Sequence, residues 1–176
     1  IEGDQEKRNL WAKVIQRRGE IGYPYIFFKD KANQGAPEVF KDNNHSINAS
    51  NLCTEIMLPT NDNWSFVCVL SSLNVLHYDK WKETDAVETM VYFLDAIITE
   101  FLEKLDNYRN SNSKDDQQTF LFMERAYNFS KENRALGMGA LGWHSLLQSK
   151  MLPFDSQEAY NLNSEVFKKI KDNSYK

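Results

Sequence analysis

The stretch SNLCTEI places Cys53 between Asn51, two residues before it, and Glu55, two residues after it. In a β-strand alternate side chains point to the same face, so an extended backbone would present the amide, the thiol and the carboxylate together. A thiol can act as a nucleophile, a redox partner or a one-electron carrier, and a carboxylate beside it can act as a general base. The same spacing also fits a half-buried strand whose cysteine is a small apolar residue. Spacing alone leaves both interpretations open.

A second thiol, Cys68, lies in the next apolar run, WSFVCVLSSLNV, after the turn-rich stretch PTNDN. If both runs are strands, the two thiols could be neighbours in space. Small or polar residues accompany each cysteine, among them Ser50 before the first and Ser71 after the second. The chain has no other cysteine, which is too few for a disulfide scaffold. The two thiols are therefore expected to be reduced, or to form a pair with a redox task.

A nucleotide-binding fingerprint is the first alternative site, because GMGALG matches G-x-G-x-x-G at Gly137, Gly139 and Gly142. That fingerprint requires a strand before it, a helix after it and an acidic residue about 20 positions further on. Asp155 and Glu158 follow at suitable distances, but no strand of a second βαβ unit comes after them. The glycines instead predict a strand or turn to which another backbone or a ligand comes close.

A structural zinc site is the second alternative. The two cysteines and the three isolated histidines, His45, His77 and His144, show none of the paired spacings that such sites use. No metal ligand is therefore predicted, and each histidine is interpreted as a surface residue or a hydrogen-bonded core residue.

The elements that must position these residues follow from periodicity and turn signals. The clearest helix begins at Asp85, where Asp85 and Glu88 have the spacing of a capping box, and Asp155 and Glu158 repeat that spacing at the last helix. Strands alternating with amphipathic helices indicate an α/β architecture. Helices are predicted over residues 4–18, 85–105, 118–129 and from 155 onward, strands over 23–28, 49–58 (or an extended loop) and 64–75, and polar loops over 30–46 and 107–118.

The composition is that of an ordinary globular domain, with 41% apolar and 26% charged residues, and the length predicts a single domain over residues 1–176. A net charge of -4 argues against a general nucleic-acid-binding surface, so no DNA partner is predicted. The sequence has neither an apolar run long enough for a membrane span nor a signal peptide, so we expect no membrane partner and a cytoplasmic location. The first residue is Ile1 rather than Met, which indicates either a trimmed chain or an internal piece of a longer polypeptide.

Four stretches, taken in order, resemble the catalytic core of the large subunit of ribonucleotide reductase. They are GYPYIFFKDKAN from Gly22, SNLCTEIMLPT from Ser50, CVLSSLNV from Cys68 and NRALGMGALGWHSLL from Asn133. The resemblance extends over roughly residues 10–167. It implies part of a ten-stranded α/β barrel with an active-site finger loop, here about residues 48–60, threaded through the centre of the barrel.

The resemblance also implies a role for each polar residue. Cys53 would be the thiyl radical that takes the 3′ hydrogen from a ribonucleotide, and Glu55 would be the base for the 3′ hydroxyl. Asn51 would be the hydrogen-bonding partner of Glu55 and, with Ser50, would bind the substrate. Cys68 would be one of two cysteines that reduce the 2′ position and become a disulfide. A loop inside a barrel would shield such a radical from water.

The partners are implied in the same way. The substrate is expected to be a ribonucleoside diphosphate, and the reductant a dithiol protein of the thioredoxin or glutaredoxin type. CVLSSLNV looks closer to class I enzymes, which bind no cofactor in this subunit and take their radical from a small subunit with a di-metal centre, than to the adenosylcobalamin-dependent class II.

The second reducing cysteine, the phosphate-binding loop and about half of the barrel strands have no counterpart here. The chain alone is therefore expected to be inactive and to need complementary fragments of the large subunit. The alternative is a non-catalytic fragment that binds nucleotide or serves as an assembly piece of a larger complex.

Overall fold

The computed structural model describes residues 2–175, and its internal contacts divide the chain into two compact units. The first unit is Ile1–Ser65 and the second is Phe66–Lys176. The stretch around Cys53 belongs to the first unit, whereas Cys68 belongs to the second. The expectation of a single domain stays a prediction.

Helix α1, Gln5–Ile21, opens the first unit. The Asp4 carboxylate caps its start by accepting a backbone N–H of the first turn at 3.0 Å. Gly22, at a φ of 78°, ends the helix by donating its N–H to the Arg18 carbonyl oxygen. The helix predicted over residues 4–18 is thus confirmed, and it continues to Ile21.

Two short helices, α2 (Lys29–Gln34) and α3 (Glu38–Asp42), follow where a polar loop was predicted over residues 30–46. That prediction is wrong for these two segments. Asn33 supplies one reason, because its side-chain amide both donates to the carbonyl oxygen of Ile47, at 2.8 Å, and accepts the Ile47 N–H, at 2.9 Å. This pair of hydrogen bonds fixes the end of α2 on the buried Ile47.

The strand predicted over residues 23–28 is not formed, and no strand occurs among the described residues of the first unit. Three of its four aromatic side chains are exposed, Tyr23 at 56%, Tyr25 at 48% and Phe28 at 68%, and Phe27 is half-buried. Pro24 lacks a backbone N–H, and a strand needs a neighbouring backbone for its N–H and C=O groups. The apolar run alone was therefore insufficient to specify a strand.

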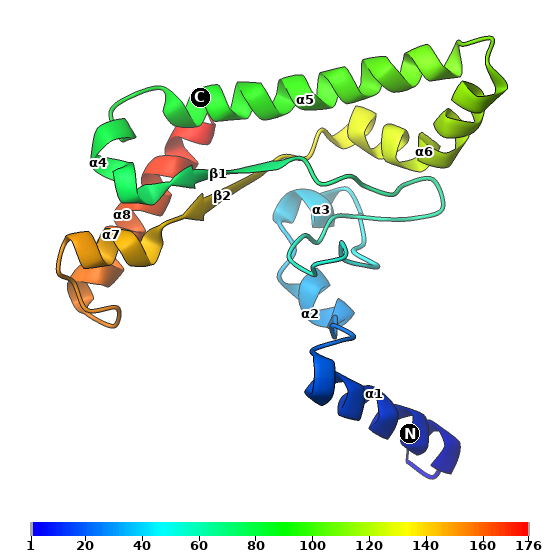
Figure 1. Ribbon diagram of the computed structural model, residues 1–176, viewed down its shortest axis with the longest axis horizontal. Coiled ribbons are helices and arrows are strands. Elements are labelled where there is room, and N and C mark those ends of the chain that lie inside the picture. The colour runs from blue at the N-terminus through cyan, green and yellow to red at the C-terminus, as the bar shows by residue number, and fades with distance from the viewer. Residues whose placement is uncertain (1, 176) are drawn as a thin grey trace. The chain divides into compact units, whose positions relative to one another are not determined.

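Two parallel strands, β1 (Leu70–Asn74) and β2 (Gly137–Leu141), form the sheet of the second unit. They pair in register from Leu70 with Gly137 to Asn74 with Leu141. Parallel strands require a long crossover, and this one is helical (Figure 1). It passes through the 3-10 turn η1 (Val75–His77) and the helices α4 (Tyr78–Trp81), α5 (Ala86–Arg109) and α6 (Lys114–Asn133). The predicted α/β architecture is confirmed, as is the end of the strand predicted over residues 64–75.

Helix α5 carries the apolar stripe that the sequence predicts. Its fully buried members are Val87, Leu94, Ile98 and Leu105. The predicted capping box is absent, because Asp85 makes no side-chain cap bond and the Thr84 hydroxyl instead accepts the Ala86 N–H at 3.3 Å. Helix periodicity was therefore a better guide here than the two acidic residues.

Helix α6 packs along α5 as the second arm of a hairpin (Figure 1). The mobile loop predicted over residues 107–118 is mostly helical, since α5 runs to Arg109 and α6 begins at Lys114. The Ser113 hydroxyl caps α6 by accepting the Asp116 N–H. Acidic residues in a first turn stabilise a helix, so the polar composition of this segment was compatible with helix from the start.

Arg134 joins the end of α6 to the middle of α5. Its guanidinium donates to the Asp95 carboxylate at 2.7 Å, to the Asp95 carbonyl oxygen at 3.0 Å and to the Thr99 hydroxyl at 2.8 Å. The hydrogen bond from Arg134 holds the pKa of the Asp95 carboxyl below its usual range. These contacts determine where the chain leaves the hairpin to enter β2.

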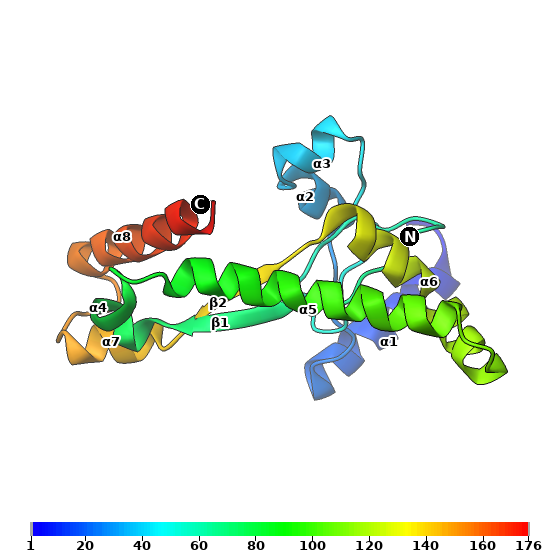
Figure 2. The same cartoon turned by 90° about the horizontal axis from the view of Figure 1, so that it is seen from above.

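The core of the second unit lies between β1, η1, α5 and the helices α7 (Trp143–Ser149) and α8 (Gln157–Ser174) (Figure 2). Its buried side chains are Leu73, Val75, Tyr78, Val87, Leu146, Val166 and Ile170. Tyr78 is 2% exposed, and its phenol donates to the Glu165 carboxylate at 3.0 Å. Burial and this hydrogen bond raise the pKa of Tyr78 to about 12. Helix α8 begins one residue after its N-cap, Ser156, rather than at the predicted Asp155.

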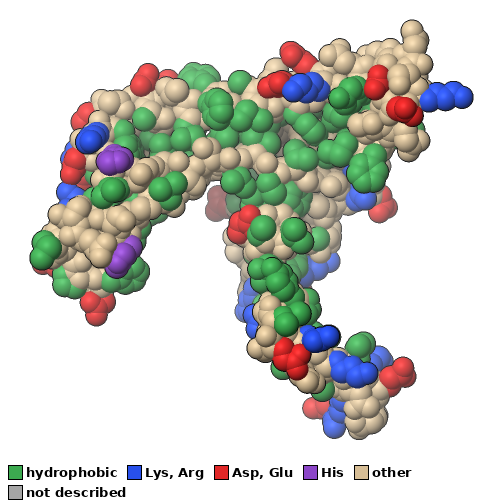
Figure 3. Space-filling view, viewed as in Figure 1, with side chains coloured by type: hydrophobic (Ala, Val, Ile, Leu, Met, Phe, Trp, Pro, Cys, Tyr) green, Lys and Arg blue, Asp and Glu red, His purple; other side chains and the backbone are tan. Residues whose placement is uncertain are grey.

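Large apolar side chains also remain on the surface of α5 and α6 (Figure 3). Phe93 is 57% exposed and Phe122 is 86% exposed. Among residues 2–175, no helix combines the length and the apolar character needed to cross a membrane.

Candidate active site

Cys53 lies in a turn and not in a strand. The Thr54 N–H donates to the Asn51 carbonyl oxygen at 3.1 Å, which makes Leu52 and Cys53 the two central residues of a β-turn. The strand predicted over residues 49–58 is therefore wrong, and so is the alternation argument that placed Asn51, Cys53 and Glu55 on one face. The alternative of a loop, which the same stretch allowed, is the one observed.

The side chain of Asn51 explains why a loop forms here. Its amide oxygen accepts the N–H of Glu55 at 3.2 Å and the N–H of Ile56 at 3.0 Å, and its backbone N–H donates to the Ile56 carbonyl oxygen at 3.1 Å. Asparagine side chains that bond nearby backbone compete with strand ladders for the same groups. Thr54, at a φ of 64°, completes the turn in the left-handed region. The residues between Asn51 and Ile56 thus form a closed tip.

The base of the same loop is also closed. The Thr60 N–H donates to the Ser46 carbonyl oxygen at 3.3 Å, and the Asn48 amide donates to the Thr60 carbonyl oxygen at 2.6 Å. Beside this base, His45 meets the ring of Trp64 edge-on, with ring centroids 4.8 Å apart. His45, Trp64 and the residues at the base of the loop line an open cavity of about 270 Å³. The hydrogen bonds at base and tip make residues 48–60 a defined loop.

The tip presents its side chains outward. Leu52 is 91% exposed, and Cys53 and Glu55 are exposed as well. The Ser50 hydroxyl donates to the Asn51 carbonyl oxygen at 3.0 Å, so it is held by the loop itself. The structure thus brings Ser50, Asn51, Cys53 and Glu55 together at one tip through a turn and not through a strand.

Tyr25 is a neighbour of this tip that sequence reasoning missed. Its hydrogen bond with Tyr23 raises the pKa of the Tyr25 phenol, and Cys53 and Glu55 make smaller contributions in the same direction. Tyr25 is therefore within electrostatic reach of the thiol and the carboxylate. The two tyrosine rings lie 5.1 Å apart between centroids. Interpreting residues 23–28 as a buried strand concealed this signal, because it assigned both rings to a core.

Cys68 lies in the second unit, in the extended segment that leads into β1. From Cys68 to Asn74 exposure alternates: the even-numbered residues are exposed, whereas the odd-numbered ones, Leu73 most of all, are more buried. Alternation therefore places Cys68 on the open face of the sheet with Leu70 and Ser72. Neither this thiol nor Cys53 forms a disulfide within the described residues. The predicted proximity of the two thiols stays a prediction.

The glycine fingerprint belongs to a strand. Gly137 and Gly139 lie inside β2, rather than between a strand and a helix, which is inconsistent with the dinucleotide-binding arrangement. A Cβ atom at Gly137 would lie 2.9 Å from the Cβ of Leu70, and one at Gly139 would lie 2.7 Å from the Ser72 hydroxyl oxygen. The glycines thus allow β2 to lie close to β1, as the close-approach interpretation predicted.

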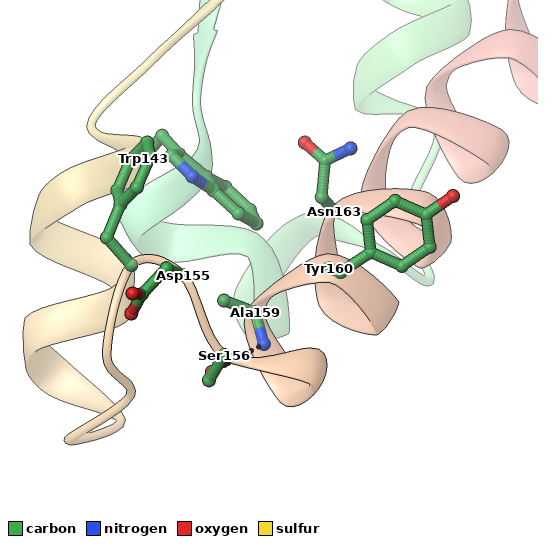
Figure 4. Close-up of a pocket in the computed structure, with 7 residues that line it drawn as sticks. Trp143, Asp155, Ser156, Ala159, Tyr160 and Asn163 are labelled. Carbon is green, nitrogen blue, oxygen red and sulfur yellow. Dashed lines mark hydrogen bonds between the residues drawn. The ribbon is translucent and has the colours of Figure 1, made fainter.

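A separate cavity of about 280 Å³ lies where α8 begins (Figure 4). Trp143 faces Tyr160 and Asn163 across it, and Ser156, which caps the Ala159 N–H, lies at its lower edge. It is lined by none of the predicted site residues. In residues 2–175 no group of three or more histidine, cysteine or acidic side chains could hold a metal ion.

The sequence family described as "Ribonucleotide reductase, barrel domain" matches residues 3–176. The chain belongs to this family of ribonucleotide reductase barrel domains.

Individual relatives agree with that membership. The chain is 37% identical over 161 residues to the ribonucleoside-diphosphate reductase large subunit of Invertebrate iridescent virus 3, a match that covers 92% of this chain and 24% of that protein. It is 30% identical over 164 residues to the ribonucleoside-diphosphate reductase large subunit of Caenorhabditis elegans, a match that covers 93% of this chain and 19% of that protein. The chain therefore spans about a quarter of these relatives or less.

A solved structure, the Actinobacillus ureae class Id ribonucleotide reductase alpha subunit, resembles the chain with a TM-score of 0.78 and 48% identity. The match covers 98% of this chain and 31% of the other. It confirms the predicted fold, a partial barrel of the ribonucleotide reductase type, with a two-stranded sheet in the described residues.

Proposed function

We propose that this chain is part of the catalytic subunit of a ribonucleotide reductase that converts ribonucleoside diphosphates to 2′-deoxyribonucleotides by thiyl-radical chemistry. The observation that carries the proposal is the closed loop tip that presents Cys53 two residues before Glu55, in a chain of this family. The names of the relatives, ribonucleoside-diphosphate reductases, support the class of substrate.

In the proposed reaction the sulfur radical of Cys53 takes the 3′ hydrogen atom of the ribose and becomes a thiol, which leaves a radical on the 3′ carbon. Glu55 accepts the proton of the 3′ hydroxyl, and the 2′ hydroxyl leaves as water. Cys68 and a second thiol from elsewhere in the large subunit supply two electrons and two hydrogens, one ending on the 2′ carbon and one in water, and become a disulfide. Glu55 then returns its proton to the 3′ oxygen, and Cys53 returns its hydrogen atom to the 3′ carbon and is again a radical.

The tip would promote the reaction by holding the thiol of Cys53 and the carboxylate of Glu55 close to the same ribose. A general base must lie within hydrogen-bonding reach of the proton that it removes, and a hydrogen-atom acceptor must lie close to the bond that it breaks. Cys53 and Glu55 are two residues apart on a backbone closed by hydrogen bonds at both ends, so one bound sugar could contact both. Ser50 and Asn51 would contact the same substrate from the near side of the turn.

The reaction needs partners that supply what these residues do not. The radical would come from a small subunit with a di-metal centre, as in class I, and the solved relative, a class Id alpha subunit, supports that class. A dithiol protein of the thioredoxin or glutaredoxin type would reduce the disulfide. Complementary segments of the large subunit would complete the barrel. Under this proposal the chain itself binds no cofactor and acts in the cytoplasm.

The test is reconstitution. The chain is mixed with complementary large-subunit segments, the small subunit and a dithiol, and deoxynucleotide formation is measured. We expect turnover for the wild type and a loss of at least about a thousandfold for Cys53→Ser, because the variant has no thiol to carry the radical. Met57→Leu, which changes an exposed sulfur in the same loop, is the matched control. Turnover by Cys53→Ser at the wild-type rate would refute the proposal.

A further inference from the structure

We propose that Asn51 is a positioning residue, whose side-chain oxygen fixes the backbone of Glu55 and Ile56 and so sets the distance between the thiol of Cys53 and the carboxylate of Glu55. The inference rests on the proposed function of the loop and deepens it. It differs from the role that the family resemblance implies, in which the amide of Asn51 meets the Glu55 side chain and the substrate.

The hydrogen bonds of Asn51 are the first argument. An amide oxygen has two lone pairs, and here the N–H groups of Glu55 and Ile56 occupy both, at 3.2 and 3.0 Å. The oxygen is therefore committed to the backbone of the two residues that follow the turn. It has no acceptor capacity left for a hydroxyl group of the substrate. The backbone N–H and C=O of Asn51 bond to Ile56 and Thr54 and complete the closure of the tip.

The conformation of Thr54 is the second argument. A β-branched residue at a φ of 64° is in a region that such residues rarely adopt, and it stays there only where its surroundings impose it. Asn51 holds Thr54 from both sides. Its carbonyl oxygen accepts the Thr54 N–H, and its side-chain oxygen accepts the N–H groups of Glu55 and Ile56. Without these bonds Thr54 would return to the extended region, and Glu55 would move away from Cys53.

Amide exchange on this chain tests the structural half of the inference. In the wild type the Glu55 and Ile56 amides should exchange slowly, and in Asn51→Ala they should exchange about tenfold faster, because each loses its acceptor. Asn51→Asp keeps an acceptor oxygen at the same place and should retain the protection. Asn61→Ala is the matched control, since the Asn61 side-chain oxygen likewise accepts a backbone N–H, that of Asn63, but outside the tip. Equal exchange in the wild type and Asn51→Ala would overturn the inference.

Activity of the reconstituted enzyme tests the functional half. A carboxylate at position 51 can accept the two backbone N–H groups but has no N–H to donate. We therefore expect Asn51→Ala to lose at least about a hundredfold in kcat with little change in KM, and Asn51→Asp to exceed Asn51→Ala at least about tenfold. If Asn51→Asp keeps the protected tip and is nevertheless as inactive as Asn51→Ala, the lost amide donor rather than the position of Glu55 accounts for the inactivity, and the inference is wrong. Failure of the wild type to turn over would instead refute the proposed function.

Discussion

One amide side chain decides the shape of the segment around Cys53. A threonine in the left-handed region costs on the order of 1–3 kcal/mol, whereas each backbone hydrogen bond that Asn51 makes contributes about 0.5–1.5 kcal/mol. Several such bonds are enough to offset the strain at Thr54. Alternation could not foresee this result, because it assumes that the backbone is already extended. An asparagine close to a residue with a reactive side chain is a reason to consider a turn first.

Tyr78 offers a test at the scale of a single residue in the second unit. Its pKa is raised to about 12, by burial first and by Glu165 second, so the folded chain keeps the phenol proton to higher pH than the unfolded chain does. The stability that this proton supports is present in full below about pH 10 and is lost as the pH rises toward about 12. Tyr78→Phe should lower the free energy of unfolding at neutral pH by about 1 kcal/mol and should lose less stability than the wild type at alkaline pH.

Denaturant titrations at about pH 7 and above about pH 10 measure both effects. Tyr92→Phe is the matched control, because Tyr92 is 66% exposed on α5 and its phenol is not part of the core. An identical alkaline loss of stability in the wild type and Tyr78→Phe would show that the Tyr78 proton does not contribute.

At the scale of elements, the close pairing of β1 and β2 depends on the absence of a Cβ atom at Gly137. At Gly137 an added Cβ would lie 2.9 Å from the Leu70 Cβ, an atom fixed to the backbone, so the strands would have to separate. Gly137→Ala should therefore cost about 1–3 kcal/mol of unfolding free energy. Gly139→Ala is the matched comparison, because the atom that it meets is the Ser72 hydroxyl oxygen, which can rotate away. Thermal unfolding should rank the Gly137 variant as the less stable, and the reverse order would contradict this account of the pairing.

The elements show where sequence reasoning succeeded and where it failed. The stripe along α5 repeats over many turns, and a signal of that length predicted the helix correctly. The run from Tyr23 to Phe28 is short, and its apolar residues could not reveal that no second strand lies beside it. The same limit applied to residues 49–58, where a single asparagine outweighed the pattern. The polar stretch before α6 was mistaken for a loop because composition was given more weight than its serine cap and acidic first turn.

At the scale of the whole molecule, the helices leave one face of the sheet uncovered. Parallel sheets normally lie buried between helices on both faces, but the face of β1 that bears Leu70 and Ser72 is exposed. Large apolar side chains such as Phe93 and Phe122 are exposed as well. Both surfaces resemble parts of a larger fold, in agreement with the 31% of the solved relative that the chain covers.

The isolated chain should therefore associate in solution and show no reductase activity. Size-exclusion chromatography with light scattering should give a broad or concentration-dependent mass, and an apolar dye should bind strongly. Adding complementary large-subunit segments should reduce dye binding as the exposed surfaces become covered. A monodisperse compact monomer with weak dye binding would contradict this expectation.

The candidate site was recognisable from the sequence only through four ordered motifs. The spacing of Cys53 and Glu55 predicted a shared strand face, whereas the structure places Cys53 in a turn. The spacing also gave no indication of Tyr25. Cys68 was expected in a strand over residues 64–75, and it lies in the extended segment just before β1, which begins at Leu70. Local patterns thus succeeded where the backbone is regular and failed at the turn, where a side chain determines the backbone.

The pairing of Leu70 with Gly137 has a consequence for the order of folding. The chain between β1 and β2 is mostly helical, so the sheet is made of contacts that are remote along the chain. Closing a long flexible loop costs conformational entropy before any strand contact repays it. Packing of α6 on α5 shortens the loop that must close. The bonds of Arg134 to α5 then hold the start of β2 close to β1. We therefore expect that prior formation of the helical hairpin lowers the entropy cost of pairing β1 with β2.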